Sequence, residues 1–594
     1  MTGPEQPEDS PAAGEPPRSG AAAGFPLLRW LDAPHPERGI RFAARDDAWE
    51  FHSYERLAAG ARRHAAQLHA AGVRPGAVVV LVHANSPEFV AAFFGALMLG
   101  ATPSPVAPPV RFQSTVQYRD HLARILRLAG ARVVSTTARL AGHVAQTSGD
   151  GVTVVIAGEP EERAPEWPGD PVAPAIGLLQ LSSGTTGPSR GVRVPLTALE
   201  TNIDTILSWT QGRTDEGAVA SWAPLYHDMG LIGCLLAPVS RNADIWLMEP
   251  EQFVRAPGRW LRCFGESGAT HTAAPTFGLR HVLRRVRRSA LDGMDFSKWR
   301  ALIVGAERVD AAVIREFAQF LEPLGFSGQA VMPAYGLAEA TLAVTGSRPD
   351  EDVTELSVRP ESLIPGSAVG IGREGTRQMT LVGCGRPFPG TGVAVVDGAG
   401  HRLAEGHLGE IELTGPSVAH GYISAEECDE HLLNGVVRTG DAGFLLHGEL
   451  FVVGRIGDSI KVRGRWLFAE ELDDVLSALE LRKGRSVALL GSIDGSDAVV
   501  VLREGGTPEE FQEIGAAVAK YASGVRVLVF AVQRGGILRT TSGKPRRRAM
   551  WERLLTDASG AGPAWDSAAT GSPGPDGGHG GDPDGGPRVA GRTT

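Results

Sequence analysis

The sequence predicts an α/β protein. We expect a large N-terminal domain of parallel and mixed sheets covered by helices, followed by a small, mobile α+β domain. Short β-rich runs alternate with helical patterns over most of the chain. Near residue 457 this pattern gives way to a glycine-bearing turn, a short strand and a helix. The length of 594 residues also suggests several domains, at about 100–200 residues each.

Apolar runs and prolines place the first strands and helix. GAVVVLVHA at 76–84 predicts a strand, and PEFVAAFFGALMLGA at 87–101 predicts a helix that begins at Pro87. ARVVSTT at 131–137 and VTVVIAG at 152–158 predict two further buried strands. Strand, helix and strand at this spacing indicate a parallel sheet covered by helices.

The C-terminal region begins with a glycine-bearing turn, a short strand and a helix. The elements predicted after these are strands at 486–493, 498–504 and 525–533 and a helix near 508–522. About a hundred residues of this kind are enough for an independent module. The predicted divisions of the chain are a disordered tail at 1–24, an N-terminal domain at 25–455, a C-terminal domain at 456–556 and a disordered tail rich in Gly, Pro and Asp at 557–594.

The composition excludes several classes of function. A net charge of −10 argues against a nucleic-acid partner. The four cysteines lie far apart with no CxxC pair, which fits neither a zinc site nor a disulfide framework and indicates a reducing compartment. The first residues lack the pattern of a signal peptide, and the most apolar run, 89–101, is too short to span a bilayer. We therefore expect a cytoplasmic protein with no stable membrane insertion.

The stretch LSSGTTGPSRGV at 181–192 clusters hydroxyls and glycines before a single cation, Arg190. It follows AIGLLQ, a predicted strand, and this combination predicts a phosphate-binding loop. No Gly-Lys-Ser/Thr follows at the spacing of a Walker A motif. Taken alone, the stretch also fits a surface connector.

Four other segments accompany this loop in a fixed order. They are SWAPLYHDMGLIG (221–233), AYGLAEATLAV (334–344), VRTGD (437–441) with GRIGDSIKVRG (454–464), and LRTTSGKPRR (538–547). With these segments the sequence resembles the adenylate-forming superfamily of acyl-CoA ligases, luciferases and peptide-synthetase adenylation domains, over residues 25–555. It is most similar to the fatty acyl-AMP ligase branch, which has stretches like YHDMGLIG, YGLAEATL and GEIELTGPSVAHGY.

The resemblance implies that a carboxylic acid attacks the α-phosphate of ATP, giving acyl-AMP and pyrophosphate, with ATP and Mg²⁺ required. Such a site binds phosphates and spreads developing negative charge. The implied phosphate-loop residues are Ser182, Ser183, Gly184, Thr185, Thr186, Gly187 and Arg190, the last standing where the family usually has lysine. Glu339 and Thr185 are the implied magnesium ligands, with phosphate oxygens and water.

Lys544 is the implied catalytic lysine, acting with His227 and Glu339. Only five of the 58 basic residues are lysines, yet the TTSGK motif keeps a lysine here. A compact ammonium can contact the attacking carboxylate and the α-phosphate together, whereas a planar guanidinium is bulkier. The alternative is a solvated lysine on a basic tail, because three arginines follow at 546–548.

The resemblance also assigns nucleotide contacts. Tyr335 stacks on adenine, Asp441 accepts both ribose hydroxyls, and Arg455 reaches ribose or phosphate. The other nucleotide-binding residues implied are Gly305, Ala306, Glu307, Gly336, Leu337 and Ala338. Most relatives have proline where Arg308 sits. Each assigned side chain has a structural alternative, such as a buried tyrosine, a capping aspartate or a surface glutamate.

The implied acyl pocket consists of Trp222, His227, Met229, Thr276, Phe277 and Gly278. A straight fatty acid is the default substrate. A bulky carboxylic acid from a natural-product pathway is the alternative, since Thr276 and Gly278 stand where relatives have other pocket residues. His271 and His281 are expected to be structural.

The segment after this pocket predicts an amphipathic helix. Leu279, Val282, Leu283 and Val286 follow the spacing i, i+3, i+4, i+7 of a buried stripe. Arginines occupy the other face, at positions 280, 284, 285, 287 and 288. This face is either merely solvated or a dock for an acidic carrier protein.

The long segment between Glu339 and Cys384 bears on which molecule accepts the acyl group. Residues from about 346 to 380 resemble the insertion of fatty acyl-AMP ligases, to which hindered rotation of the C-terminal domain about a hinge near 457–458 is attributed. We therefore expect transfer to a phosphopantetheine thiol of a carrier protein or partner enzyme, in lipid or natural-product biosynthesis. The alternatives are a complete acyl-CoA synthetase, favoured by the GTTG of the phosphate loop, and an inactive nucleotide-binding relative, which predicts loss of Lys544 or Glu339.

Overall fold

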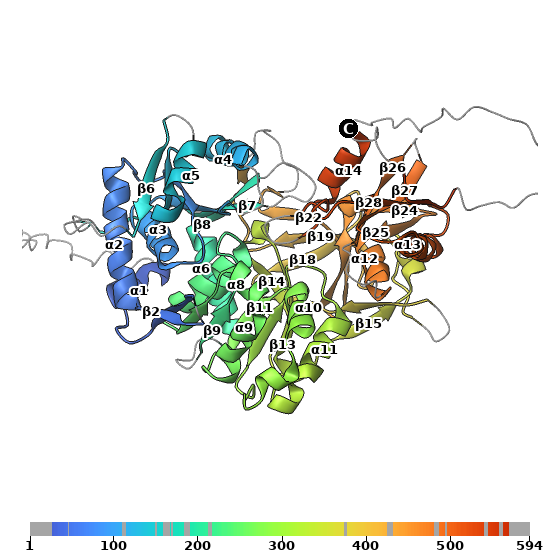
Figure 1. Ribbon diagram of the computed structural model, residues 1–594, viewed down its shortest axis with the longest axis horizontal. Helices are drawn as coiled ribbons and strands as arrows, with labels where there is room; N and C mark the ends of the chain where they lie inside the picture. Colours follow the sequence, from blue (N-terminus) through green and yellow to red (C-terminus); the bar gives the residue numbers. More distant parts are fainter. Residues whose placement is uncertain are drawn as a thin grey trace, which may run out of the picture.

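The computed structural model describes residues 26–45, 47–109, 115–148, 151–158, 167, 170–182, 190–211, 217–372, 377–423, 432–479, 486–493, 496–539, 544–556 and 562–568. Sheets and helices from the N-terminal end and from the last hundred residues lie at opposite ends of the long axis (Figure 1). Within these ranges every helix is too short or too polar to cross a lipid bilayer.

The first parallel sheet confirms the strands and helix predicted from the apolar runs. Its order is β4-β3-β5-β6, and each neighbouring pair is parallel. Apolar side chains of helices α2 and α3 pack against it in one buried cluster. The bounds are β3 (Val78–Val82), β4 (Thr102–Val106), β5 (Val133–Thr137), β6 (Thr153–Ala157), α2 (Tyr54–Ala70), α3 (Pro87–Met98), α4 (Thr115–Ala129) and α5 (Ala138–Ser148).

Strand β4 was not predicted, because its sequence TPSPV contains two prolines. The N–H of Thr102 donates toward β3, to Ala77 O at 2.8 Å, so the alternation of a strand turns the proline nitrogens to the other side. On that side the hydroxyls of Thr102 and Ser104 donate to Ile176 O (2.9 Å) and Leu179 O (3.1 Å). The prolines therefore interrupt no ladder, as expected of an edge strand.

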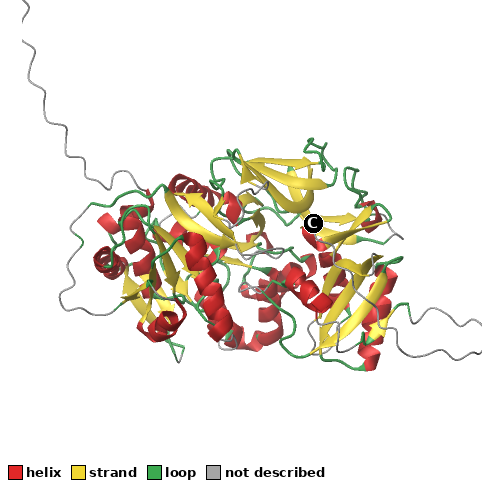
Figure 2. Cartoon of the chain, turned by 90° about the horizontal axis from the view of Figure 1, so that it is seen from above, coloured by secondary structure: helices red, strands yellow, loops and turns green. Residues whose placement is uncertain are grey.

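A nine-stranded sheet forms the centre of the molecule, in the order β17-β14-β13-β12-β11-β9-β10-β1-β2. In the part of this order that runs from β13 to β1, each neighbouring pair of strands is parallel. The carboxyl ends of these strands therefore lie along one edge of the sheet. Helices flank the sheets on both sides (Figure 2). The bounds are β1 (Gly39–Ala43), β2 (Trp49–Ser53), β9 (Val219–Ser221), β10 (Ile245–Leu247), β11 (His271–Ala274), β12 (Ala301–Val304), β13 (Val331–Gly336), β14 (Ala343–Gly346) and β17 (Arg386–Pro387).

Helices α8 (Pro250–Arg255), α9 (Pro257–Gly265), α10 (Thr276–Arg285) and α11 (Ala311–Leu321) contribute to a second buried cluster on this sheet. In α10 the predicted stripe is partly right. Leu279 and Val282 are fully buried and Leu283 is half-buried. The helix ends at Arg285, so Val286 lies in extended backbone just beyond it.

Smaller sheets complete the N-terminal part. Strand β7 pairs with β8, and β8 with β20; β22 joins β19 to β23; and β15 pairs with β16 inside the predicted insertion. The remaining bounds are β7 (Ile176–Ser182), β8 (Arg190–Pro195), α6 (Leu196–Trp209), the π-helix η3 (Met229–Leu236), β15 (Glu355–Val358), β16 (Met379–Val382), β18 (Gly392–Val396), β19 (Gly409–Thr414), β20 (Tyr422–Ile423), β21 (Leu432–Leu433), β22 (Val436–Leu446) and β23 (Glu449–Arg455).

The C-terminal region contains the predicted strands and helix in the predicted order. A four-stranded sheet, β26-β27-β28-β29, carries helices α12, α13 and α14 (Figure 1). The bounds are β24 (Ser459–Val462), β25 (Arg465–Phe468), α12 (Ala469–Ala478), β26 (Ser486–Ile493), β27 (Ser496–Glu504), α13 (Pro508–Tyr521), β28 (Arg526–Val532), α14 (Arg547–Thr556) and β29 (Trp565–Asp566).

An apolar cluster joins this region to the rest of the chain. Trp466 and Phe468 of β25 are buried together with Phe444 and Phe451 of the β22–β23 hairpin. Leu363, from the predicted insertion, belongs to the same cluster. The insertion is therefore part of a shared core rather than a surface loop.

Asn85, just after β3, ties the first sheet to the central one. Its side-chain amide donates to Ala223 O (3.0 Å) and Met248 O (2.7 Å), and its carbonyl accepts from Leu225 N (3.0 Å). The residue is 7% exposed, so water does not replace these bonds easily.

We predict that Asn85→Ala lowers the free energy of unfolding by about 1–3 kcal/mol, because it leaves buried backbone groups unpaired. Denaturant melts of the variant beside wild type measure this effect. Gln319→Ala, on the exposed face of α11, is the control and should change stability by less than about 0.5 kcal/mol. Equal melts for Asn85→Ala and wild type would contradict the assignment.

Candidate active site

A cavity of about 1940 Å³ lies between the carboxyl ends of β11, β12 and β13 and the C-terminal region. It brings together residues from all the sequence motifs. The predicted site residues that line the cavity are Arg190, His227, Met229, Thr276, Phe277, Gly305, Ala306, Glu307, Tyr335, Gly336, Leu337, Ala338, Glu339, Asp441, Arg455 and Lys544. The parallel strands explain the convergence of residues 276–277, 305–307 and 335–339, since the ends of β11, β12 and β13 share one edge.

The predicted phosphate loop connects two paired strands. Ser182 at the end of β7 is opposite Arg190 at the start of β8. The residues between them that were predicted to hold phosphates, Ser183, Gly184, Thr185, Thr186 and Gly187, lie outside the described residues. Arg190 lines the cavity, which places this end of the loop beside the other motifs.

The turn after β12 carries Gly305, Ala306 and Glu307. Ala306 has φ 64°, a left-handed conformation that costs energy for a residue with a side chain and that often marks a functional site. Glu307 accepts the N–H of Phe277 at 2.7 Å. Burial raises the pKa of Glu307, opposed by this hydrogen bond and by the charge of Lys544.

Asp441 is shared between two side chains. The Tyr335 hydroxyl donates to its Oδ2 at 2.7 Å, and the Arg455 Nε lies 2.7 Å from its Oδ1. Burial, followed by the charge of Asp441, raises the pKa of Tyr335, so its hydroxyl remains a donor. A carboxylate has about four acceptor positions, so Asp441 keeps capacity for further donors.

Glu339 lies in a short 3₁₀ turn after β13 and accepts the Tyr422 hydroxyl at 2.9 Å. The Arg190 guanidinium lies 5.5 Å from the centre of the Tyr422 ring, within the range of a cation–π contact. Tyr422 was not predicted as a site residue, although it stands in the AHGY stretch of the resemblance. It links Glu339 to the start of β8.

His227 and Asp228 precede the π-helix η3, and π-helical turns are frequent at functional sites. His227 Nδ1 lies 2.5 Å from Asp228 Oδ1, and Met229 N donates to the same carboxylate at 2.7 Å. Burial alone would raise the pKa of Asp228, but His227, Met229 N–H and Lys544 together hold it below its usual value. Sequence reasoning missed Asp228, although it lies within the YHDMG motif.

The charge of Lys544 reaches carboxylates from two separate segments. Its charge acts on both Asp228 and Glu307, which come from different strand ends of the central sheet. Lys544 and both carboxylates line the cavity.

The predicted acyl pocket divides into two groups. Met229, Thr276, Phe277 and His227 line the cavity, whereas Trp222 and Gly278 do not. The Trp222 ring stacks on Phe253 at 4.0 Å, and a Cβ added to Gly278 would lie 2.5 Å from Trp222 Cζ2. Gly278 therefore makes room for the Trp222 ring and widens no tunnel.

The cavity has an apolar extension on another side. It is lined by Ile206 and Trp209 of α6, Gly233 of η3, Leu342 just before β14 and Ala343 at its start. Trp209 donates its Nε1–H to Ser347 O at 2.6 Å, which fixes the ring. These residues were not predicted. Ile206 and Trp209 belong to a helix with no motif, and Gly233, Leu342 and Ala343 lie in motif segments at positions to which no role was assigned.

The two other histidines considered have backbone partners. His271 Nε2 lies 2.9 Å from Thr210 O, and His281 Nε2 lies 2.9 Å from Val254 O. Neither residue lines the cavity.

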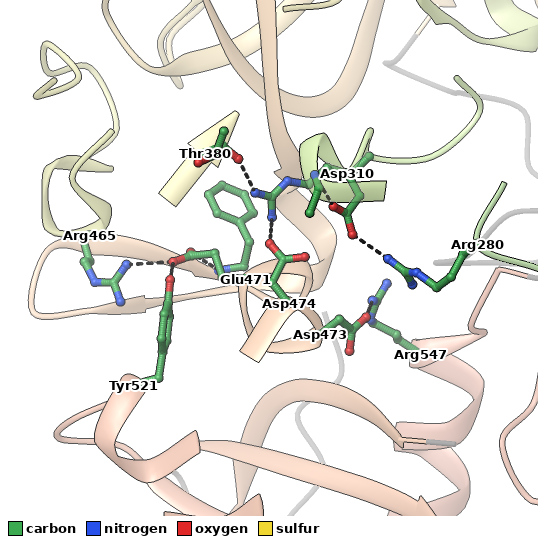
Figure 3. Close-up of polar contacts among 12 residues, drawn as sticks. Arg280, Asp310, Thr380, Arg465, Glu471, Asp473, Asp474, Tyr521 and Arg547 are labelled. Carbon is green, nitrogen blue, oxygen red and sulfur yellow. Dashed lines mark hydrogen bonds and ion pairs between the residues drawn. The ribbon is translucent and has the colours of Figure 1, made fainter. Parts of the chain in front are cut away.

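Helix α12 closes the cavity on the C-terminal side. Arg308, next to the Gly305–Glu307 turn, lies 2.8 Å from Asp474 Oδ2 and donates to Thr380 O at 3.4 Å. Figure 3 shows this region, where Glu471 accepts from Tyr521 (2.7 Å) and Arg465 (3.3 Å). Arg308 thus connects the turn to α12.

The segment carrying Lys544 is anchored by Arg547. Its guanidinium contacts Asp473, and Nη1 lies 3.4 Å from Asp458 and 3.5 Å from Glu470. Burial raises the pKa of Glu470 to about 7, against the opposing charge of Arg547. Asp458 stands at the predicted hinge, so one arginine connects the hinge, α12 and the lysine segment.

Among the described residues no cluster of three or more His, Cys, Asp or Glu could hold a metal by itself. Magnesium at nucleotide sites is usually bound by one or two carboxylates with phosphates and water. Glu339 is such a carboxylate at the cavity wall.

Comparisons with known proteins agree with this arrangement. The chain is 32% identical over 545 residues to a Caulobacter vibrioides protein named provisionally as an acyl-CoA synthetase, covering 88% of this chain and 94% of that one. It is 30% identical over 511 residues to the medium-chain fatty acid–acyl-carrier-protein ligase JamA of Moorena producens, covering 80% and 85%.

A solved structure from work on fatty acyl-adenylate ligases of E. coli and L. pneumophila matches with a TM-score of 0.83 and 28% identity. The match covers 91% of this chain and all of that one. The sequence also matches the AMP-binding enzyme family over residues 33–423, which include all the cavity motifs except those at 437–464 and 538–547. The chain thus belongs to the AMP-binding enzyme family, uses ATP as that family does, and has fatty acyl-adenylate ligases among its structural neighbours.

Proposed function

We propose that this enzyme converts a fatty or fatty-like acid and ATP into acyl-AMP and pyrophosphate, and passes the acyl group to a phosphopantetheine thiol. The observation that carries the proposal is the convergence of Lys544, Asp228 and Glu307 with the nucleotide motifs in one cavity. The relative from Moorena producens, named as a ligase that acts on acyl carrier protein, supports the acceptor. The buried free thiols of Cys234, Cys263 and Cys384 support a cytoplasmic, reducing location.

In this proposal the β12–β13 edge holds the nucleotide. Tyr335 offers its ring to adenine beside the backbone of the Gly305–Glu307 turn, while Asp441 accepts the ribose hydroxyls. Arg455, already paired with Asp441, completes this contact or reaches phosphate. The phosphate loop at 182–187 and Arg190 hold the β- and γ-phosphates. Glu339, with Thr185, holds Mg²⁺, which would neutralise phosphate charge.

The acid carboxylate is held near Lys544. Its ammonium would stabilise negative charge that develops as the carboxylate oxygen attacks the α-phosphorus and pyrophosphate leaves. His227 and Met229 border the carboxylate, with Thr276 and Phe277 beside them. The apolar extension at Ile206 and Trp209 is the part of the cavity suited to an alkyl chain, while Trp222 and Gly278 form the wall behind Thr276.

The second candidate function differs in the acyl acceptor. A complete acyl-CoA synthetase is the alternative, favoured by the name of the Caulobacter vibrioides relative. Contacts of the insertion with the C-terminal region favour the acyl-AMP ligase instead. The Arg377 guanidinium lies 3.3 Å from the centre of the Tyr521 ring and donates to Tyr521 O at 3.1 Å, and Arg465 donates to Pro360 O at 3.1 Å. These contacts would resist rotation at the hinge.

Lys544→Ala should abolish adenylation while ATP still binds, because most nucleotide contacts lie outside the C-terminal region. We expect a rate loss of about 10²–10³, and Lys544→Arg should recover little of it because the guanidinium is planar and larger. ATP–pyrophosphate exchange measures the rate, and Lys520→Ala on α13 is a control for removal of a lysine. Near-normal exchange by Lys544→Ala would exclude the catalytic role.

Asp441→Ala should weaken ATP binding by about 1–3 kcal/mol, because ribose hydroxyls lose their acceptor. Calorimetric titration with ATP gives the change. Tyr335→Phe removes the hydroxyl bonded to Asp441 but keeps the ring, so its affinity should stay near that of wild type. If Tyr335→Phe loses as much affinity as Asp441→Ala, Asp441 is a structural acceptor and not a ribose ligand.

Arg377→Ala should leave adenylation intact and raise acyl-CoA output. An exposed cation–π contact is worth about 0.5–1 kcal/mol, so the rotated form should gain about two- to five-fold in population. Point substitution is preferable to deleting 346–380, because that segment contributes Leu363 to the shared core. Arg348→Ala, in the same segment but paired with Glu351, is the control. Abundant acyl-CoA from the wild-type enzyme would favour the acyl-CoA synthetase instead.

A further inference from the structure

Four arginines at the C-terminal end of α10 and just beyond it form a basic cluster. We call Arg284, Arg285, Arg287 and Arg288 the α10 basic patch. All four are exposed, and none forms an ion pair with any residue that the structure describes. Their neighbours differ, since Arg280 pairs with Asp310 at 2.5 Å and Arg315 with Glu355 at 2.7 Å. The patch stands out in a chain whose net charge is −10.

Exposed apolar side chains border the patch. Phe277, at the start of α10, is 38% exposed, and Val254 of α8 is 53% exposed. His281 joins them, because its Nε2 lies 2.9 Å from Val254 O and it follows Phe277 by one helical turn. Arg285 continues the same stripe. Arginine beside exposed aromatic and aliphatic groups is typical of protein–protein interfaces.

The surface begins at the active-site cavity. Phe277 and Arg284 both line the cavity, and the Phe277 N–H donates to Glu307, which feels the charge of Lys544. From Phe277 to Arg285 the helix rises about 12 Å. A partner bound along α10 would therefore sit at the edge of the cavity.

The buried side of α10 argues against a lipid surface as the partner. Leu279 and Val282 are fully buried in the cluster that includes Phe253 and Trp260, so the helix has no apolar face left to enter a bilayer. A nucleic acid is disfavoured because the four cations of the patch offer few phosphate contacts and the chain as a whole is acidic.

We propose that the α10 basic patch docks an acidic carrier domain whose phosphopantetheine thiol receives the acyl group. This inference rests on the proposed function and adds where the partner binds. Opposite charges would speed the encounter and orient the carrier, while Phe277 and Val254 would supply apolar contact. Arg285 and Arg288 of the patch do not line the cavity, so carrier loading can be tested separately from adenylate formation.

The test compares the charge-reversed variant Arg285→Glu/Arg288→Glu with a control, Arg56→Glu/Arg63→Glu. The control makes the same change of charge on exposed residues of α2, which lies at the far edge of the molecule from α10 (Figure 1). Adenylate formation is followed by trapping acyl-AMP with hydroxylamine. Acyl transfer is followed with an acidic bacterial acyl carrier protein in its phosphopantetheine form, and separately with CoA.

We expect all three proteins to form acyl-AMP within two-fold of each other. For carrier loading, kcat/KM of the α10 variant should fall on the order of ten-fold, with little change in the α2 control. Added salt should reduce the wild-type rate toward that of the variant, because it screens exposed charges.

Unchanged loading by the α10 variant would overturn the docking proposal and leave the proposed function in place. An equal fall in the α2 control would show a net-charge effect, and a fall confined to CoA transfer would assign the patch to CoA phosphates; either result overturns the proposal. Acyl-AMP formation with no carrier loading by wild type would instead overturn the carrier step of the proposed function, and the docking proposal with it.

Discussion

The active-site region depends on parallel pairing among β9, β11, β12 and β13. Because these strands run the same way, the segments that follow them emerge on one edge of the sheet. The His227–Asp228 pair, the turn at Gly305 and the 3₁₀ turn at Glu339 are all such segments. Helices on both sides of the sheet bury its strands between them and so fix the position of this edge (Figure 2).

Much of this could be predicted from the sequence, since apolar runs such as 76–84 and 486–493 identify buried strands without tertiary information. The family resemblance also predicted many of the residues that line the cavity, such as Tyr335, Glu339 and Lys544. Contacts between distant elements were not predictable. Trp222 fills the space above Gly278, and Ile206 and Trp209 line the apolar extension from a helix with no motif. Periodicity identifies a buried face but not the cavity that the face borders.

Charge is distributed unevenly between the two sides of the cavity. On the central-sheet side, Asp228, Glu307 and Asp441 each have a cation or N–H donor in contact. On the α12 side, Asp458, Glu470 and Asp473 surround the single Arg547. Burial raises the pKa of Asp458 and raises that of Glu470 to about 7, because a charged carboxylate is poorly solvated there. The lysine segment is thus fixed by an acid-rich cluster rather than by a simple ion pair.

The prolines of β4 have a consequence for how the sheets are joined. Toward β7, β4 offers the hydroxyl hydrogens of Thr102 and Ser104, so side-chain hydrogen bonds help to join the two sheets. Removing one side-chain oxygen atom would remove one of these hydrogen bonds. The backbone hydrogen bonds of a strand ladder cannot be removed in this way. Since β7 ends at Ser182, where the predicted phosphate loop begins, the two hydroxyls anchor the strand that leads into that loop.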